Sequence, residues 1–146
     1  MDAENTVEDE LRCERACTHL CNDFAWTVDQ RDYRAFVDLF TEGGAFERPG
    51  QRSVGHAAIR QFLDTRPVDR VTRHIISNIR INMTGPATAT GTCSALMYQA
   101  THDSASAPTQ PLPVSAPVVV DYVDDYALTS GGWKFACRRT SMVFQP

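Results

Sequence analysis

The stretch VTRHIISNIRINM, residues 71–83, decides the fold class of this chain. It is rich in β-branched and aliphatic residues and holds neither glycine nor proline, which is typical of a long β-strand. Three later runs share this character, at residues 87–100, 118–128 and 133–144. Because turn residues or a loose segment separate neighbouring runs, we expect four long antiparallel strands.

The N-terminal part of the chain has the periodicity of a helix instead. Within residues 7–28, Cys13, Cys17 and Cys21 are spaced four residues apart and share one helix face with Phe24. Such regular spacing along a rigid helix suits a core face better than a tetrahedral zinc site, so we expect buried thiols rather than a metal or redox site. The two remaining cysteines receive the same interpretation: Cys93 and Cys137.

Two shorter helices and a small hairpin are expected between the first helix and the strands. Asp32 can cap a short second helix. The apolar residues of 58–63 predict a third helix, which Pro67 ends. Between these helices, the Pro49-Gly50 pair is a turn signal and predicts a hairpin. Its two strands are residues 45–47 and 52–54.

Helices followed by a meandering sheet make an α+β domain in which the helices cover one face of the sheet. We expect a cone-shaped, curved antiparallel sheet wrapped around the long N-terminal helix, with two further helices beside it. The open end of such a cone is a natural pocket for a small molecule. Residues 1–146 make a single domain, with a flexible N-terminus at 1–6 and a mobile loop, rich in Ser, Ala and Pro, at 103–117.

Composition excludes several classes of function. The chain carries 14 Lys and Arg residues against 18 Asp and Glu residues, a net charge of −4, so it offers no basic stripe for nucleic acid. No run approaches the roughly 18 apolar residues that a membrane span needs. The acidic start MDAENTVEDE does not resemble a signal peptide. We therefore expect a cytoplasmic protein that contacts neither nucleic acid nor membrane.

Four histidines are present, and His74 is the one best placed for chemistry. Strand alternation puts it on one face with Thr72, Ile76, Asn78 and Arg80, whereas the other face is more apolar. A face that mixes imidazole, amide and aliphatic groups can line a partly polar cavity, although a bulge would exchange parts of the two faces. A purely structural histidine remains the alternative.

The order of these elements and six local motifs resemble the SnoaL-like branch of the nuclear transport factor 2-like superfamily. The motifs are VDQRDY at 28–33, DLFT at 38–41, VGHAAI at 54–59, RHIISN at 73–78, YVDDY at 122–126 and GWKF at 132–135. The resemblance covers nearly the whole chain and implies the cone-shaped fold. That fold hosts dehydratases, isomerases, cyclases, dehydrochlorinases and plain binding proteins, so the activity has to be argued from the site.

In the dehydratases and dehydrochlorinases of this branch, an aspartate from the first helix and a histidine on the first long strand form a dyad. The resemblance implies that Asp29 and His74 fill these two places. A carboxylate bonded to one imidazole nitrogen fixes the tautomer and stabilises the imidazolium, which makes the other nitrogen a better base. The alternative is that Asp29 serves only as a helix-end or turn group.

Other residues are candidates for substrate contact. Asn78 follows His74 on the same expected face and either orients a substrate oxygen or braces the backbone. Asp124 either acts as a second acid or base, as an acidic residue does in the related cyclases, or pairs with Arg138 or Arg139 across the sheet. Five large side chains are expected in the cavity wall or in the core: Trp26, Phe46, Met97, Tyr98 and Tyr122.

Departures from the family bear on the reaction. The related dehydrochlorinases carry a lysine on the first helix and an arginine late in the third long strand, and neither is present here. Scytalone-type dehydratases place a tyrosine directly before the dyad aspartate, where this chain has Val28. We therefore do not expect this protein to share the leaving-group chemistry of those enzymes.

These observations lead to one main hypothesis and one alternative. The main hypothesis is a cofactor-independent lyase or isomerase, dehydratase-like, in which His74 and Asp29 abstract a proton from a small hydrophobic molecule, cyclic or aromatic. The alternative is a non-catalytic binding protein, or an accessory subunit of a complex of the ring-hydroxylating dioxygenase type. In either case we expect no metal, no cofactor, and a homodimer or homotrimer.

Overall fold

A capping box begins the long helix α1 (Val7–Asp29). The Thr6 side chain accepts a hydrogen bond from the backbone N–H of Asp9, and the Asp9 carboxylate accepts one from the backbone N–H of Thr6. These bonds satisfy donors that a helix otherwise leaves free at its N-terminus. The computed structural model describes residues 4–103 and 111–146. The predicted first helix over residues 7–28 is confirmed.

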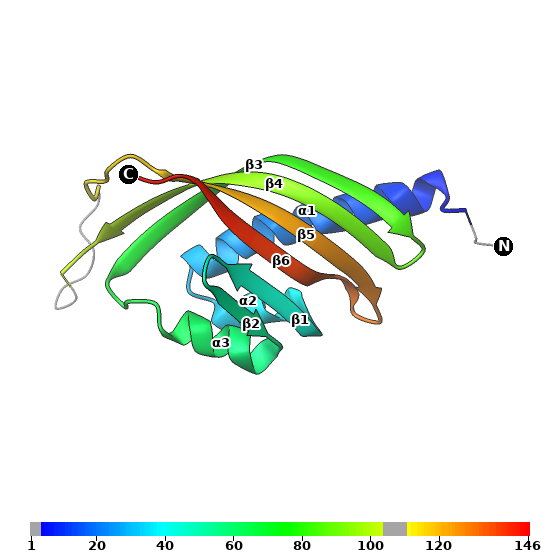
Figure 1. Cartoon of the computed structure of the whole chain (residues 1–146), viewed down its shortest axis with the longest axis horizontal. Coiled ribbons are helices and arrows are strands. Elements are labelled where there is room, and N and C mark those ends of the chain that lie inside the picture. The colour runs from blue at the N-terminus through cyan, green and yellow to red at the C-terminus, as the bar shows by residue number, and fades with distance from the viewer. Residues whose placement is uncertain (1–3, 104–110) are drawn as a thin grey trace.

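The two shorter helices also lie where the sequence predicts them. Asp32 caps α2 (Tyr33–Asp38) by accepting a hydrogen bond from the backbone N–H of Ala35. The third helix, α3 (His56–Asp64), contains the apolar run and ends before Pro67. Figure 1 shows α2, α3 and the hairpin gathered below the long strands, while α1 runs beside these strands.

Six strands form one sheet in the order β2-β1-β6-β5-β4-β3. Their bounds are β1 Phe40–Arg48, β2 Gln51–Val54, β3 Arg70–Gly85, β4 Thr88–Thr101, β5 Val118–Thr129 and β6 Gly132–Phe144. The four long strands pair in antiparallel fashion and the hairpin is present, as predicted. One pairing corrects the expectation of an antiparallel sheet: β1 lies parallel to β6, so the sheet is mixed.

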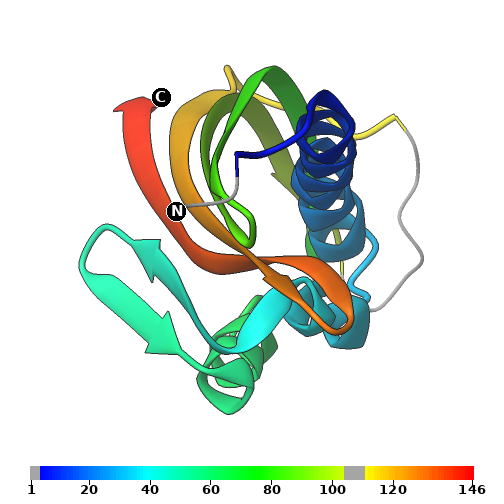
Figure 2. The same cartoon turned by 90° about the vertical axis from the view of Figure 1, so that its right-hand side faces the viewer.

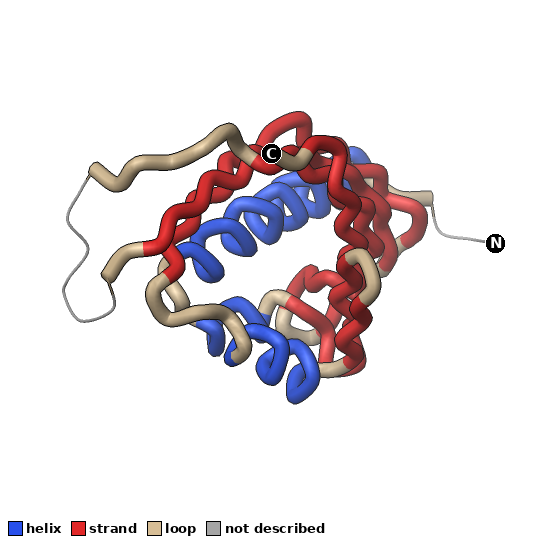
Figure 3. The backbone as a smooth tube through the Cα atoms, turned by 60° about the vertical axis from the view of Figure 1, so that its left-hand side comes forward, coloured by secondary structure: helices blue, strands red, loops and turns tan. Residues whose placement is uncertain are grey.

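The sheet curves over the helices, and the core lies between them. Seen along the molecule, the long strands bend around a space that α1 closes on one side (Figure 2). Figure 3 shows all three helices on this concave side. Aromatic rings fill the closed end, with Phe24 of α1 in ring contact with Phe36, Phe46 and Phe135. The cone shape and the position of the helices are therefore as predicted.

A β-bulge divides β3 into two parts, and beyond the bulge the alternation of inward and outward side chains is shifted by one residue. The pairing with β4 shifts between Ser77 and Arg80, and Asn78 adopts a left-handed backbone with φ of 55°. Before the bulge, His74 faces inward; after it, Ile79 and Ile81 pack against the core instead. The expected alternation is therefore wrong beyond residue 77.

The cysteines behave as the spacing predicts. All five are buried and none forms a disulfide.

Two other expectations concern segments that the structure describes only in part. Residues 1–3 and 104–110, within the predicted flexible N-terminus and mobile loop, lie outside the described residues. In the ranges that are described, none of the helices has the length and apolar character needed to cross a membrane.

Candidate active site

Asp29, the last residue of α1, and His74, on β3, are in direct contact. Oδ1 of Asp29 lies 2.7 Å from Nδ1 of His74, and Oδ2 accepts a hydrogen bond of 2.8 Å from the backbone N–H of His74. The side chains are only 6% and 10% exposed, respectively. Because an ionised carboxylate can only accept, Nδ1 carries the proton and Nε2 presents its lone pair.

A network of hydroxyl and guanidinium groups holds the end of α1 against the start of β3. Thr72 donates a hydrogen bond of 2.8 Å to Oδ1 of Asp29, and Arg66 donates one of 3.1 Å to the Thr72 hydroxyl. Arg66 also binds the carbonyl of Val28 at 3.0 Å. Arg31, whose left-handed backbone with φ of 59° follows the helix, donates to carbonyls just before and at the start of β3. The position of Asp29 is thus fixed from both elements.

The surroundings of Asp29 keep its carboxyl ionised. Burial acts to raise its pKa, since a low-dielectric site disfavours the charged form. Hydrogen bonds and charge from His74, together with the hydrogen bond from Thr72, outweigh burial and lower the pKa of Asp29 below its ordinary value of 3.8. The Asp29 carboxyl is therefore ionised at neutral pH and orients the ring of His74.

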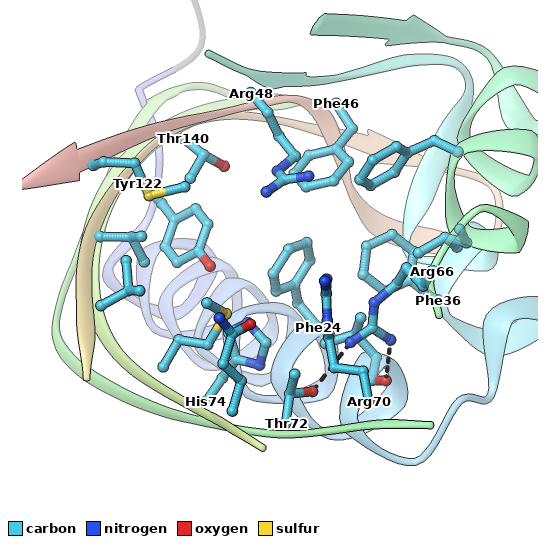
Figure 4. Close-up of a pocket in the computed structure, with 18 of the residues that line it drawn as sticks. Phe24, Phe36, Phe46, Arg48, Arg66, Arg70, Thr72, His74, Tyr122 and Thr140 are labelled. Carbon is cyan, nitrogen blue, oxygen red and sulfur yellow. Dashed lines mark hydrogen bonds between the residues drawn. The ribbon is translucent and has the colours of Figure 1, made fainter. Parts of the chain in front are cut away.

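His74 lines a cavity of about 540 Å³ between the sheet and the helices. Figure 4 shows the imidazole on one side of this space, with Phe24, Phe36 and Phe46 around it. Within the described part of the chain, Nε2 makes no hydrogen bond. The volume suits a molecule of one or two rings, and the aromatic lining suits an apolar one. The cavity therefore offers a space lined by aromatic rings beside the oriented imidazole.

Four of the predicted residues line this cavity, and Asp29 lies outside the lining in contact with His74. The predicted residues that line it are His74, Phe46, Met97 and Tyr122. The hydroxyl of Tyr122 points into the space, and no partner for it is found among the described residues (Figure 4). These four residues lie on the inner face of the sheet.

Three of the other four predicted residues lie away from the cavity, which corrects their expected place, and the fourth is paired as one of its two stated alternatives predicts. Trp26 is 66% exposed, because it lies on the face of α1 opposite Phe24. Asn78 is exposed at the bulge, and Tyr98 borders a separate shallow pocket instead of the main cavity. Asp124 is wholly buried and bonded to Arg138, which is the alternative pairing that the sequence left open.

Several polar lining residues were missed. Arg48, Arg66, Arg70, Gln99 and Thr140 all border the cavity. A signal for Arg48 was present, because it lies two residues after Phe46 on the same strand and therefore on the same face. Thr140 lies two residues after the buried Arg138 on β6, so it also lies on the inner face of the sheet.

Comparison of the sequence with models of known protein families identifies the family of this chain. The model of the SnoaL-like domain matches residues 9–139. The chain belongs to the SnoaL-like domain family. A comparison with curated proteins finds no match.

Solved structures resemble this SnoaL-like domain over most of its length. Rv3472, a protein of unknown function from Mycobacterium tuberculosis, is 22% identical with a TM-score of 0.79, over 98% of this chain and 79% of the other. A candidate scytalone dehydratase from Novosphingobium aromaticivorans is 21% identical with a TM-score of 0.78, over 95% and 89%. The hexachlorocyclohexane dehydrochlorinase LinA-type3 from Novosphingobium barchaimii is 17% identical with a TM-score of 0.77, over 95% and 92%. At these identities the likeness establishes the shared nuclear transport factor 2-like fold.

The SnoaL-like domain also contains a buried polar cluster beside the cavity. Arg138 donates to both carboxylate oxygens of Asp124 at 2.8 Å and to the sulfurs of Cys21 and Cys93 at 3.3 and 3.2 Å. A hydrogen bond from Cys93 lowers the pKa of the Cys21 thiol to about 7, against the effect of burial. Two sulfurs and a carboxylate oxygen converge closely enough for a metal ion, but the guanidinium already serves as their common cation. The Tyr126 hydroxyl completes the cluster by donating to Asp124.

Proposed function

We propose that this SnoaL-like domain is a cofactor-independent lyase of the dehydratase type, or an isomerase, that acts on a small cyclic or aromatic molecule. The observation that carries the proposal is the contact of 2.7 Å between Asp29 and His74 at the wall of a cavity lined by aromatic rings. The arrangement provides an oriented base beside a space that can hold an apolar ring.

The proposed reaction begins with proton abstraction. Nε2 of His74 takes a proton from a substrate carbon next to a carbonyl, and the electron pair of that C–H bond moves into an enolate. The Asp29 carboxylate stabilises the imidazolium that forms. In a lyase, the enolate electrons re-form the carbonyl and make a C=C bond while the C–O bond to a β-hydroxyl breaks, and the imidazolium protonates that oxygen, which departs as water. In an isomerase, the imidazolium returns the proton to another carbon of the enolate system. General acid–base help of this kind contributes roughly 100- to 10,000-fold.

Tyr122 is placed to stabilise the enolate oxygen. Burial raises the pKa of its phenol above the ordinary value, and the charge of Arg138 only partly opposes this effect. The hydroxyl therefore keeps its proton and is available as a hydrogen-bond donor into the cavity. A donor aimed at the developing charge complements the base in the same cavity.

The names of two structural neighbours agree with an elimination reaction. One is a candidate scytalone dehydratase and another a hexachlorocyclohexane dehydrochlorinase. The lysine and arginine that the dehydrochlorinases of this branch carry are absent here, and Val28 stands where scytalone-type dehydratases place a tyrosine. We therefore propose that this protein shares proton abstraction by the dyad with those enzymes but does not share their leaving-group chemistry.

Hydrogen–deuterium exchange tests the base with any ketone that enters the cavity, so the natural substrate is not needed. The protein is incubated in D₂O with a panel of cyclic and aryl ketones, and NMR follows loss of the signal from the α C–H. We expect exchange above background for at least one ketone, and a loss of about 100-fold or more in His74→Gln. Asp29→Asn should also slow exchange, because its amide no longer stabilises the imidazolium.

A matched control separates catalysis by the dyad from general base effects. His19 lies exposed on α1, so His19→Gln should leave exchange unchanged. Equal exchange in the wild type and His74→Gln would exclude His74 as the base. Saturable binding of the ketones without exchange would favour the alternative function, a binding protein or accessory subunit.

A further inference from the structure

An arginine enters the cavity without a charged partner. Arg48 lies at the end of β1, half-buried, with its guanidinium pointing into the cavity (Figure 4). Its guanidinium carbon lies 5.1 Å from the centre of the Phe62 ring. Within the residues that the structure describes, it forms neither an ion pair nor a hydrogen bond, in contrast to Arg66. Burial lowers its pKa, which marks the unfavourable solvation of this charge.

The whole cavity is positively charged although the chain is acidic. Its described lining includes Arg48, Arg66 and Arg70 but neither Asp nor Glu, whereas the chain as a whole has a net charge of −4. The nearby carboxylate of Asp29 is already engaged by three hydrogen bonds. A desolvated cation without a counterion is unfavourable, so an anionic ligand gains free energy by entering.

A second polar group lies on the same side of the cavity. The Thr140 hydroxyl is buried, has no hydrogen-bond partner within the described part of the chain, and borders the cavity. Figure 4 shows Thr140 and Arg48 on one side of the space and His74 across from them. A buried hydroxyl without a partner is destabilising, and an acceptor group on a ligand would remove that cost.

We propose that Arg48 and Thr140 form an anion subsite that binds a carboxylate group of the ligand. This inference rests on the proposed function and specifies its substrate class. The substrate is a cyclic or aromatic carboxylic acid. The planar guanidinium matches a planar carboxylate with two parallel hydrogen bonds, and the Thr140 hydroxyl donates a third. With the carboxylate held there, the ring lies among the phenylalanines and its far end faces Nε2 of His74. Arg48 thus sets which carbon meets the base.

Binding of small probe acids tests the subsite directly. Calorimetric titration compares benzoate, phenylacetate and cyclohexanecarboxylate with their neutral primary amides, which have nearly the same shape. The wild type should bind at least one acid more tightly than its amide. Arg48→Gln should weaken that acid by about 10- to 100-fold and leave the amide unchanged, so that the preference disappears. Thr140→Val should weaken the acid about fivefold.

The matched control is the neighbouring arginine of the same hairpin. Arg52, on β2, is exposed and pairs with Glu47, so Arg52→Gln should keep the full preference. Arg48→Lys retains the charge and should retain part of the preference. Should Arg48→Gln fail to fold, the NMR signal of the Arg48 Nε–H, assigned by its absence in Arg48→Lys, should shift when benzoate is added to the wild type.

The outcomes separate this inference from the proposed function. Absence of saturable binding by all three acids, equal binding of acids and amides, or a preference that survives in Arg48→Gln would each overturn the subsite. Loss of the preference in His74→Gln but not in Arg48→Gln would assign the carboxylate to the imidazole and also overturn it. Carboxylate preference in a protein that catalyses no exchange would leave the subsite standing while the proposed function fails.

Discussion

Asp29 receives three hydrogen bonds from a three-residue segment of β3, and they bear on stability as well as on chemistry. The segment from Thr72 to His74 supplies a hydroxyl, a backbone N–H and a ring N–H to one carboxylate. A single side chain at the end of α1 therefore joins the helix to the sheet. Its charge state should influence how stably the two elements stay together.

The pH dependence of folding should reveal this contribution. Because the pKa of Asp29 is lower in the folded protein than its ordinary 3.8, the charged form stabilises the fold at pH values above that value. The contribution is lost as the pH falls through the folded-state pKa. Asp29→Asn removes it, so the variant should be less stable than the wild type at about pH 6 and should lose less stability on acidification to about pH 3. Urea unfolding at a series of pH values measures both.

The control for this experiment is an exposed carboxylate. Asp64 on α3 pairs only with Arg60, four residues before it, at the surface. Asp64→Asn should therefore leave the acid limb of the stability curve close to that of the wild type. Parallel acid limbs for the wild type and Asp29→Asn would contradict the assigned role of the carboxylate.

Among the elements, β3 most clearly marks how far the sequence can be interpreted. Alternation along residues 71–77 correctly puts His74 on the inner face and Ile75 on the outer one. The same rule fails after Asn78, because the bulge adds one residue and exchanges the two faces. The alternation of side chains along a strand does not reveal where a bulge inserts an extra residue. The inward turn of Ile79 and Ile81 has a clear benefit, since both then pack against the core.

The left-handed backbone at Asn78 can be tested by substitution. Asparagine tolerates positive φ, glycine adopts it freely, and a β-branched residue is strained there. We expect Asn78→Val to lower the free energy of unfolding by about 1–3 kcal/mol and Asn78→Gly to change it little. Chemical denaturation measures the difference. Asn82, exposed on the same strand after the bulge, is the control, and Asn82→Val should stay within about 0.5 kcal/mol. Equal effects at the two positions would contradict strain at Asn78.

Helix α1 shows a second limit of a similar kind. The spacing of Cys13, Cys17 and Cys21 correctly predicts the buried face of the helix. The size and hydrophobicity of Trp26 predict a place in the cavity wall or the core, but its angular position relative to Phe24 puts it on the exposed face. Arg48 is the opposite case, because a charged residue is usually exposed, whereas the face that it shares with Phe46 turns it inward.

At the scale of the whole molecule, the order of elements predicts the cone, but one pairing lies beyond the reach of the sequence. The hairpin of β1 and β2 joins the sheet through β6, and the parallel partners Phe46 and Arg138 are distant in the chain. Local patterns do not encode which distant edge a short hairpin will join. This pairing closes one side of the cavity and brings the inner face of β1, with Phe46 and Arg48, to it.

The outer face of the sheet offers a surface for self-association. Ile75, Leu96, Val119 and Phe144 are successive cross-strand partners on β3, β4, β5 and β6. Ile75, Leu96 and Phe144 are 53%, 38% and 68% exposed, respectively. They form a continuous apolar row across four strands, whereas scattered single apolar residues would need no explanation. A neighbouring copy of the chain can cover this apolar row.

We propose that copies of this SnoaL-like domain associate through this row, as a homodimer or homotrimer. Size-exclusion chromatography with light scattering should give two or three times the chain mass of 16.2 kDa at micromolar concentration. Ile75→Lys and Leu96→Lys should each shift the mass to that of a monomer, because a lysine cannot be buried there without a partner. Val68, 80% exposed in the loop before β3, is the control, and Val68→Lys should leave the mass unchanged. A monomeric wild type, or variants that keep the wild-type mass, would exclude this surface. Because the row lies on the face opposite His74, the monomeric variants should keep the cavity and its binding preference, which separates assembly from the chemistry of the site.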